Sequence, residues 1–128
     1  MLKKVLIIDD DADLVEAITT LLDAKGYDVT SARDGEEGFK KAKADLPDLI
    51  LLDVMMTRQG EGFDVAAKLR GEPATKDIPI VMVTGIRKEM NLPFGFEPDK
   101  EWLPVNAVLE KPVKPEVLLK VVEENIRK

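Results

Sequence analysis

Cysteine and histidine are both missing from this sequence of 128 residues. Without thiols the chain can form neither disulfide bonds nor thiolate metal sites, which is compatible with a reducing cytoplasm. Without imidazole it contains no Ser-His-Asp triad, no histidine general base and no histidine metal ligand. Any reactive or metal site in this chain must therefore be built from oxygen ligands, hydroxyls and lysine.

Long apolar runs and an excess of positive charge are also lacking. No apolar stretch approaches the roughly 20 residues that cross a membrane, and the short apolar run after Lys3-Lys4 ends in acids, unlike a signal peptide. The formal net charge of −6 at pH 7 disfavours nucleic acid, because phosphate backbones are bound by clustered Lys and Arg. We therefore expect a cytosolic protein with no membrane insertion and no direct binding to nucleic acid.

The composition is that of one folded domain. Hydrophobic residues make up 45% of the chain and charged residues 34%, which is typical of globular proteins. A chain of this length can bury roughly two thirds of its unfolded surface in one core. Because there is no repeat or linker and the last helical pattern runs almost to the end, we expect a single domain, residues 1–128, with no output domain.

Apolar runs alternate with helical patterns along the chain. Strands are expected at Val5–Ile8, Tyr27–Ala32, Leu49–Asp53, Ile78–Thr84 and Ala107–Leu109. Helices are expected at Ala12–Lys25, Glu36–Ala44, Phe63–Arg70 and Pro115–Ile126, with a loop at Val54–Glu61. This alternation predicts an α/β fold with right-handed crossovers, a parallel sheet and helices on both of its faces.

Local signals refine three of these elements. Asp10, Asp11 or Asp13 can cap the first helix, and Gly26 ends it. The last helix is expected to turn five apolar residues inward: Val117, Leu118, Val121, Val122 and Ile126. Between the last two strands only about one helical turn is expected, at Ile86–Met90, because three prolines follow it: Pro93, Pro98 and Pro104.

Acidic side chains follow two of the predicted strands. Asp9 and Asp10 come directly after the first apolar run, and Asp53 ends the third. The carboxyl edge of a parallel sheet is where ligands bind, and carboxylates about 4 Å apart there repel by about 4 kcal/mol at an effective dielectric constant near 20. Either their pKa values rise or a hard cation binds; oxygen ligands with open positions suit Mg²⁺. The alternative is that the acids only cap the first helix.

Asp53 is the candidate nucleophile. A carboxylate can attack phosphorus to give an acyl phosphate. Lys111, after the last strand, would supply a fixed positive charge, and Thr84, at the end of the fourth, a hydrogen bond to a phosphoryl oxygen. Taken singly, Thr84 could be an ordinary strand-end residue and Lys111 a solvated lysine.

Taken together, these residues resemble a known family. Asp9-Asp10, Asp53, Thr84 and Lys111-Pro112, in this order and across the whole chain, are similar to the signature of response regulator receiver domains of two-component signal transduction. The resemblance implies that Asp53 is the phosphoacceptor, that Thr84 senses the phosphoryl group and that Lys111 binds it. It also implies a doubly wound, five-stranded, flavodoxin-like parallel sheet in the order 2-1-3-4-5.

The resemblance further implies a metal ion and partners. Asp9, Asp10 and Asp53, with the backbone carbonyl of Met55, would hold Mg²⁺, with Mn²⁺ as an alternative ion. The phosphoryl group would come from a phosphohistidine on a histidine kinase or histidine phosphotransfer protein, which fits the absence of histidine here. The signal would pass to a downstream protein target. Such a domain assists its own phosphorylation and dephosphorylation but is not an enzyme.

Some residues depart from the family pattern. Val108 replaces an aromatic switch residue, and the interval from Thr84 to Lys111 is about five residues longer than usual, so a shortened or irregular fourth helix is expected. Any switch must then run through Thr84 and the proline-rich segment 86–106. Its aromatic residues either fill a small cluster or form a partner surface: Phe94, Phe96 and Trp102.

Other phosphoryl chemistry fits the sequence less well. A haloacid-dehalogenase-like phosphatase would need a second Asp where Met55 stands, and the chain has no Gly-x-x-x-x-Gly-Lys-Ser/Thr stretch for a P-loop. The remaining alternative is a receiver fold retained as a protein–protein interaction module that is never phosphorylated.

Overall fold

The computed structural model describes residues 2–53, 61–84, 105–110 and 113–127. The strands are β1 (Lys4–Ile8), β2 (Asp28–Ala32), β3 (Leu49–Asp53), β4 (Ile80–Thr84) and β5 (Ala107–Glu110). The helices in the same ranges are α1 (Ala12–Ala24), α2 (Gly35–Asp45), α3 (Glu61–Gly71) and α5 (Pro115–Asn125). The five strands form one sheet in the order β2-β1-β3-β4-β5, with every neighbouring pair parallel. The predicted fold class and strand order are confirmed.

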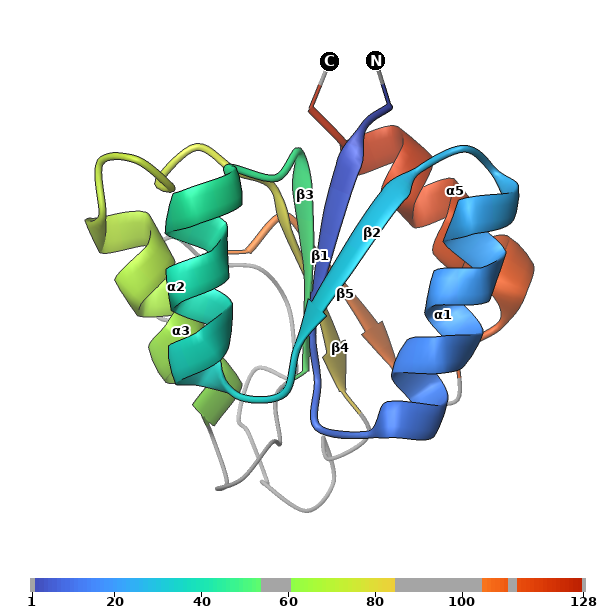
Figure 1. Cartoon of the computed structure of the whole chain (residues 1–128), viewed down its shortest axis with the longest axis horizontal. Helices are drawn as coiled ribbons and strands as arrows, with labels where there is room; N and C mark the ends of the chain where they lie inside the picture. The colour runs from blue at the N-terminus through green and yellow to red at the C-terminus, as the bar shows by residue number, and fades with distance from the viewer. Residues whose placement is uncertain (1, 54–60, 85–104, 111–112, 128) are drawn as a thin grey trace.

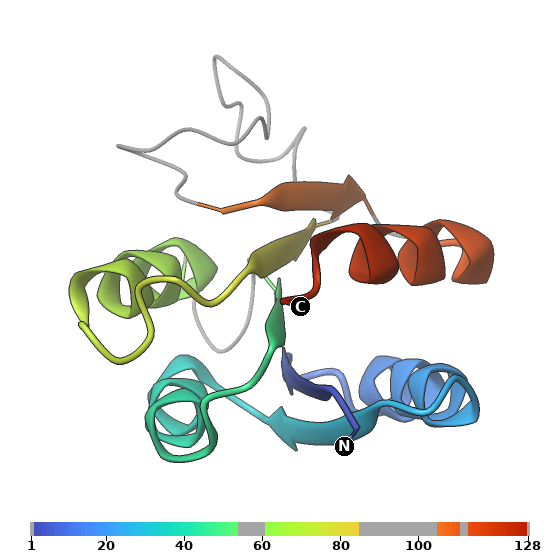
Figure 2. The ribbon, with the colours of Figure 1, turned by 90° about the horizontal axis from the view of Figure 1, so that it is seen from above.

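Helices cover both faces of the sheet. Helices α2 and α3 lie on one side, and α1 and α5 lie on the other (Figures 1 and 2). Because both faces are covered, the central strands cannot alternate between apolar and polar residues. β3 accordingly is buried at all five positions.

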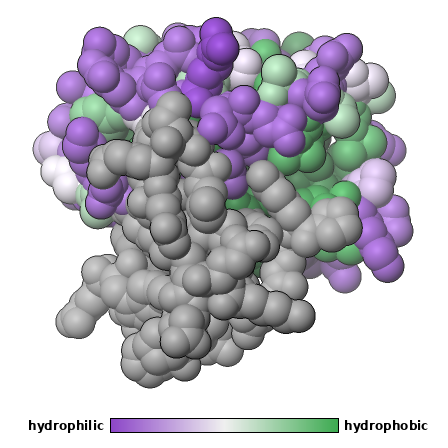
Figure 3. Space-filling model, turned by 90° about the horizontal axis from the view of Figure 1, so that it is seen from below, coloured by the Kyte–Doolittle hydropathy of each residue, from purple (hydrophilic) through white to green (hydrophobic). Residues whose placement is uncertain are grey.

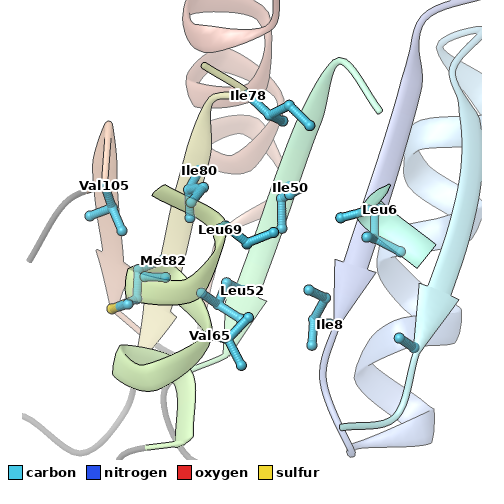
Figure 4. Close-up of a cluster of buried hydrophobic side chains, with 13 residues drawn as sticks. Leu6, Ile8, Ile50, Leu52, Val65, Leu69, Ile78, Ile80, Met82 and Val105 are labelled. Carbon is cyan, nitrogen blue, oxygen red and sulfur yellow. The ribbon is translucent and has the colours of Figure 1, made fainter. Parts of the chain in front are cut away.

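Successive residues of the central strands supply two separate apolar cores. On β1, Leu6 and Ile8 point into the core beneath α2 and α3, and Val5 and Ile7 into the core beneath α1 and α5. The first core is shown in Figure 4, where side chains from four strands and α3 meet. The sheet is thus held from both sides, which fixes the positions of its strand ends.

The helix ends follow from local chemistry. Asp11 is the N-cap of α1, since its carboxylate accepts hydrogen bonds from the backbone N–H groups of Asp13 and Leu14. Gly26, just beyond the helix, has a φ of 87°, a conformation that glycine adopts without the cost of a Cβ. Pro115 begins α5, where its missing N–H is not needed.

Eight of the nine predicted elements differ from the structure by one or two residues at one end or both, and one burial prediction is wrong. β4 begins at Ile80 instead of Ile78, because the Ile78 N–H donates to the Thr75 carbonyl in a turn. α3 begins at Glu61, which was expected in the loop, instead of Phe63. α5 ends at Asn125, one residue before Ile126. Val117 is 41% exposed, because α5 turns Leu118 and Val122 toward the sheet instead.

Further predictions lie outside the described residues. These are the loop at 54–60, the single helical turn at 86–90 with the short or irregular fourth helix, and the cluster of Phe94, Phe96 and Trp102. Val108, on β5, is partly buried against the core beneath α2 and α3.

The surface near α1 and α5 is apolar. Viewed from the carboxyl ends of the strands, hydrophobic side chains gather over these two helices (Figure 3). They line a hollow of about 270 Å³ between Leu14, Ile18 and Leu21 of α1 and Val113, Pro115 and Leu118 near α5. None of the helices in the described part of the chain combines the length and apolarity needed to cross a membrane.

Arg70 ties three elements together at the opposite, amino edge of the sheet. Its Nη1 donates to the carbonyls of Lys76 (2.9 Å) and Ile78 (2.7 Å), and its Nη2 donates to Asn106 Oδ1 (2.9 Å). The same Asn106 oxygen accepts the Ile80 N–H at 2.9 Å. Burial lowers the pKa of Arg70, and the Asp77 carboxylate opposes this shift. Arg70 therefore joins the end of α3 to the starts of β4 and β5.

Replacing Arg70 by methionine is expected to lower the free energy of unfolding by about 1.5–3 kcal/mol, because hydrogen bonds from a charged donor are lost while much of the apolar stem is kept. Urea unfolding followed by circular dichroism would measure the loss. Arg33→Met, which removes an exposed guanidinium, is the control. Equal unfolding midpoints for the two variants would contradict the role given to Arg70.

Candidate functional site

Three carboxylates meet where two neighbouring strands end. Asp9 and Asp10 follow β1, and Asp53 is the last residue of β3, which pairs with β1 through Ile8 and Leu52. One carboxylate oxygen from each acid lies within 4.8 Å of those from the other two. The parallel register thus brings together side chains that are more than forty positions apart in the sequence.

The cluster is buried on one side and open on the other. Asp9 is 5% exposed and Asp53 4%, whereas Asp10 is exposed. Two full charges 4.8 Å apart repel by about 3.5 kcal/mol at an effective dielectric constant of about 20. A divalent cation offsets this repulsion directly. Oxygen-only ligands with one open side suit Mg²⁺, which keeps several water ligands when protein-bound.

Backbone hydrogen bonds orient Asp9. Its Oδ1 accepts the Asp11 N–H at 2.9 Å, and its own N–H donates to the Ala32 carbonyl on β2 at 3.0 Å. Asp11 in turn caps α1 with its carboxylate. The alternative that the acids only cap the helix therefore holds for Asp11, whereas Asp9 and Asp10 converge with Asp53.

Thr84 lies on the same edge of the sheet. Its backbone ends β4, one residue beyond Val83, the register partner of Asp53. It pairs with Glu110 of β5, directly before Lys111. The side chain of Thr84 and the whole of Lys111 lie outside what the structure describes, so their predicted contacts stay predictions.

The same holds for Met55. Its carbonyl is a predicted metal ligand, and it lies outside the described ranges. Among the predicted site residues, the structure thus brings together the three acids, Asp9, Asp10 and Asp53.

A family comparison agrees with this arrangement. A family model described as the response regulator receiver domain matches residues 5–123. The chain therefore belongs to this family. The receiver domain also resembles the solved structure of the chemotaxis response regulator CheY4 of Vibrio cholerae, with a TM-score of 0.80 and 30% identity over 97% of this chain and 98% of that one.

Two relatives of this receiver domain are longer proteins. It is 37% identical over 115 residues to the alkaline phosphatase synthesis transcriptional regulatory protein PhoP of Bacillus subtilis, covering 90% of this chain and 45% of that protein. It is 41% identical over 86 residues to the response regulator PleD of Caulobacter vibrioides, covering 67% of this chain and 19% of that protein. The receiver domain spans less than half the length of either relative, and the absence of an output domain stays a prediction.

One residue near the site does not stand out in the sequence. Gly38, inside α2, is buried against Ile8, the residue before Asp9. The sequence does hold one signal for it, which is a glycine at a helical position. Glycine there lowers helix stability by about 1 kcal/mol relative to alanine, so tight packing is the expected reason for it.

Replacing the cap residue Asp11 by alanine is expected to lower the free energy of unfolding by about 1 kcal/mol, because two N–H groups of the first turn lose their acceptor. Asp13→Ala is the matched control, since it removes a first-turn charge that does not cap. Urea melts of both variants test this. An equal loss in Asp13→Ala would show that helix charge, and not capping, matters.

Asp9→Asn is expected to raise the free energy of unfolding by about 1–2 kcal/mol in chelator-treated buffer, because it removes one of the repelling charges and keeps an oxygen that can accept the Asp11 N–H. At saturating Mg²⁺ the order should reverse, since a ligand that binds only the folded state stabilises it. Thermal melts with and without Mg²⁺ measure both effects. A wild-type chain more stable than the variant without divalent ions would contradict the account.

Proposed function

We propose that this chain is a phosphoacceptor receiver that takes a phosphoryl group from a partner phosphohistidine onto Asp53 and then signals through partner binding. The convergence of Asp9, Asp10 and Asp53 supports this most strongly. Response regulator receivers are signalling modules that partner with histidine kinases, and a histidine phosphotransfer protein is a second source of the same group.

The donor set fits a resident Mg²⁺ ion. Asp9, Asp10 and Asp53 would hold it together with the Met55 carbonyl, and Mn²⁺ has the same preference for oxygen. When bound, the ion supplies positive charge for the phosphoryl oxygens. The exposed position of Asp10 leaves one side of the cluster open to a donor.

The transfer itself needs only a carboxylate nucleophile from this chain. An Asp53 oxygen forms a bond to phosphorus, the phosphorus–nitrogen bond to the partner imidazole breaks, and the electron pair of that bond returns to nitrogen. Thr84 would donate a hydrogen bond to a phosphoryl oxygen and Lys111 would neutralise another. The burial of Asp53 limits the access of water to the resulting acyl phosphate.

The decisive measurement is Mg²⁺-dependent phosphorylation by a small phosphodonor such as phosphoramidate, detected as a mass increase. Asp53→Asn should abolish the labelling, because the amide is a poor nucleophile. Asp23→Asn, an exposed acid at the far end of α1, should label like the wild type. Chelating Mg²⁺ should also stop the reaction.

The competing function is a receiver fold that only binds a partner protein and is never phosphorylated. Wild-type protein that stays unlabelled at saturating donor and Mg²⁺ would favour this function and overturn the proposal. Labelling that persists in Asp53→Asn would instead place the phosphoacceptor on another residue.

A further inference from the structure

Gly38 of α2 lies against Ile8, the last residue of β1. It is the fourth of the eleven residues of α2 and is buried. Among the described residues, the glycine with a positive φ is Gly26, so Gly38 is not there for left-handed backbone freedom. Alanine would favour the helix more strongly than glycine, and the reason for glycine must therefore lie in packing.

The packing reason is Ile8. A Cβ built on Gly38 would lie 2.5 Å from Cδ1, 2.8 Å from Cγ1 and 2.9 Å from Cγ2 of Ile8. These distances are far below the 3.5–4.0 Å at which carbon atoms attract each other. Rotation of one terminal methyl cannot relieve them, because both branches of the side chain are too close and a β-branched residue is stiff at χ1.

Ile8 has little room to move away. It is 0% exposed and belongs to the core of Figure 4, where it stands at the end of β1 beside Leu52. Its backbone is paired on both sides, with Ala32 of β2 and with Leu52 of β3. Other small residues line the same buried side of α2, which lets the helix approach: Gly35 and Ala42.

A displacement of Ile8 would also move Asp9 of the acidic cluster, because one peptide bond joins the two residues. Asp9 follows Ile8 directly, and its N–H is fixed to the Ala32 carbonyl. Mg²⁺ demands a nearly ideal octahedron of oxygen ligands at 2.0–2.1 Å. A shift of a few tenths of an ångström at Asp9 is therefore large compared with the tolerance of such a site.

We propose that Gly38 is a positioning residue for the metal site: its missing side chain lets α2 hold Ile8, and through Ile8 the Asp9 carboxylate, in register with Asp53. This inference rests on the proposed function, because it assumes that the acidic cluster binds Mg²⁺. According to this inference, α2 helps to set the affinity for Mg²⁺ although it contributes no acid to the cluster.

The test is Mg²⁺ affinity by titration calorimetry on folded protein, well below the melting temperature of each variant. Gly38→Ala should bind about tenfold more weakly, the lower end of the cost of losing a residue that supports a metal ligand. Gly71→Ala is the matched control, since nothing lies within 4 Å of a Cβ there, and it should bind like the wild type.

Trimming Ile8 separates positioning from a general loss of stability. Ile8→Ala removes all three crowded atoms, so adding Gly38→Ala to it should cost no further affinity. Ile8→Val removes only Cδ1, and adding Gly38→Ala to it should cost an intermediate amount. These pairs also decide the question if Gly38→Ala alone does not fold.

The possible outcomes distinguish a failure of the inference about Gly38 from a failure of the proposed function on which it rests. Wild-type protein that does not bind Mg²⁺ would overturn the metal site, and the inference with it. Wild-type protein that binds while Gly38→Ala binds equally well, even with a lower melting temperature, would overturn the inference alone, because α2 would then have moved outward and left Asp9 in place. An equal loss of affinity with and without Ile8→Ala would also overturn it.

Discussion

Repulsion between carboxylates that the sheet forces together is the constraint on which the rest of this structure depends. Asp53 ends β3, Asp9 directly follows the neighbouring parallel strand β1, and both are almost fully buried. The pairing of β1 and β3 keeps the backbones of these two acids close together, and like charges at such a distance repel. A cation bound between carboxylates offsets such repulsion.

The opposite edge of the sheet is tied down by hydrogen bonds. Arg70 joins α3, β4 and β5 there. Asp48 accepts the Lys4 N–H with its carboxylate, donates its N–H to the Lys4 carbonyl and accepts the Arg127 N–H with its own carbonyl. The first and last described segments of the chain both reach this edge (Figure 1). These hydrogen bonds fix the amino edge of the sheet, whereas the carboxyl edge carries the acidic cluster.

The sequence predicted most of the elements because its apolar patterns are strong. β3 is a run of apolar residues ending on Asp53, and such a short run is typical of a strand covered on both faces. The errors fall where local signals compete. Apolar Ile78 is typical of a strand, but its N–H donates to a carbonyl in a turn. Val117 fits the apolar stripe of a helix, but α5 packs on the sheet in an orientation that leaves Val117 exposed. Strand pairing and the rotation of a helix about its axis depend on contacts between remote residues, so no short segment of sequence determines them.

The sequence by itself determined the chemistry that is available: acids after apolar runs, a hydroxyl and a lysine at strand ends, and no imidazole or thiol to serve instead. Only the tertiary structure decided which of these acids caps a helix and which of them form the cluster. It assigned Asp11 to the cap of α1, brought Asp9 and Asp10 to Asp53, and set Gly38 against Ile8. The physical reason is that residue type fixes what a side chain can do, whereas distances between remote residues exist only once the strands have paired and the helices have packed.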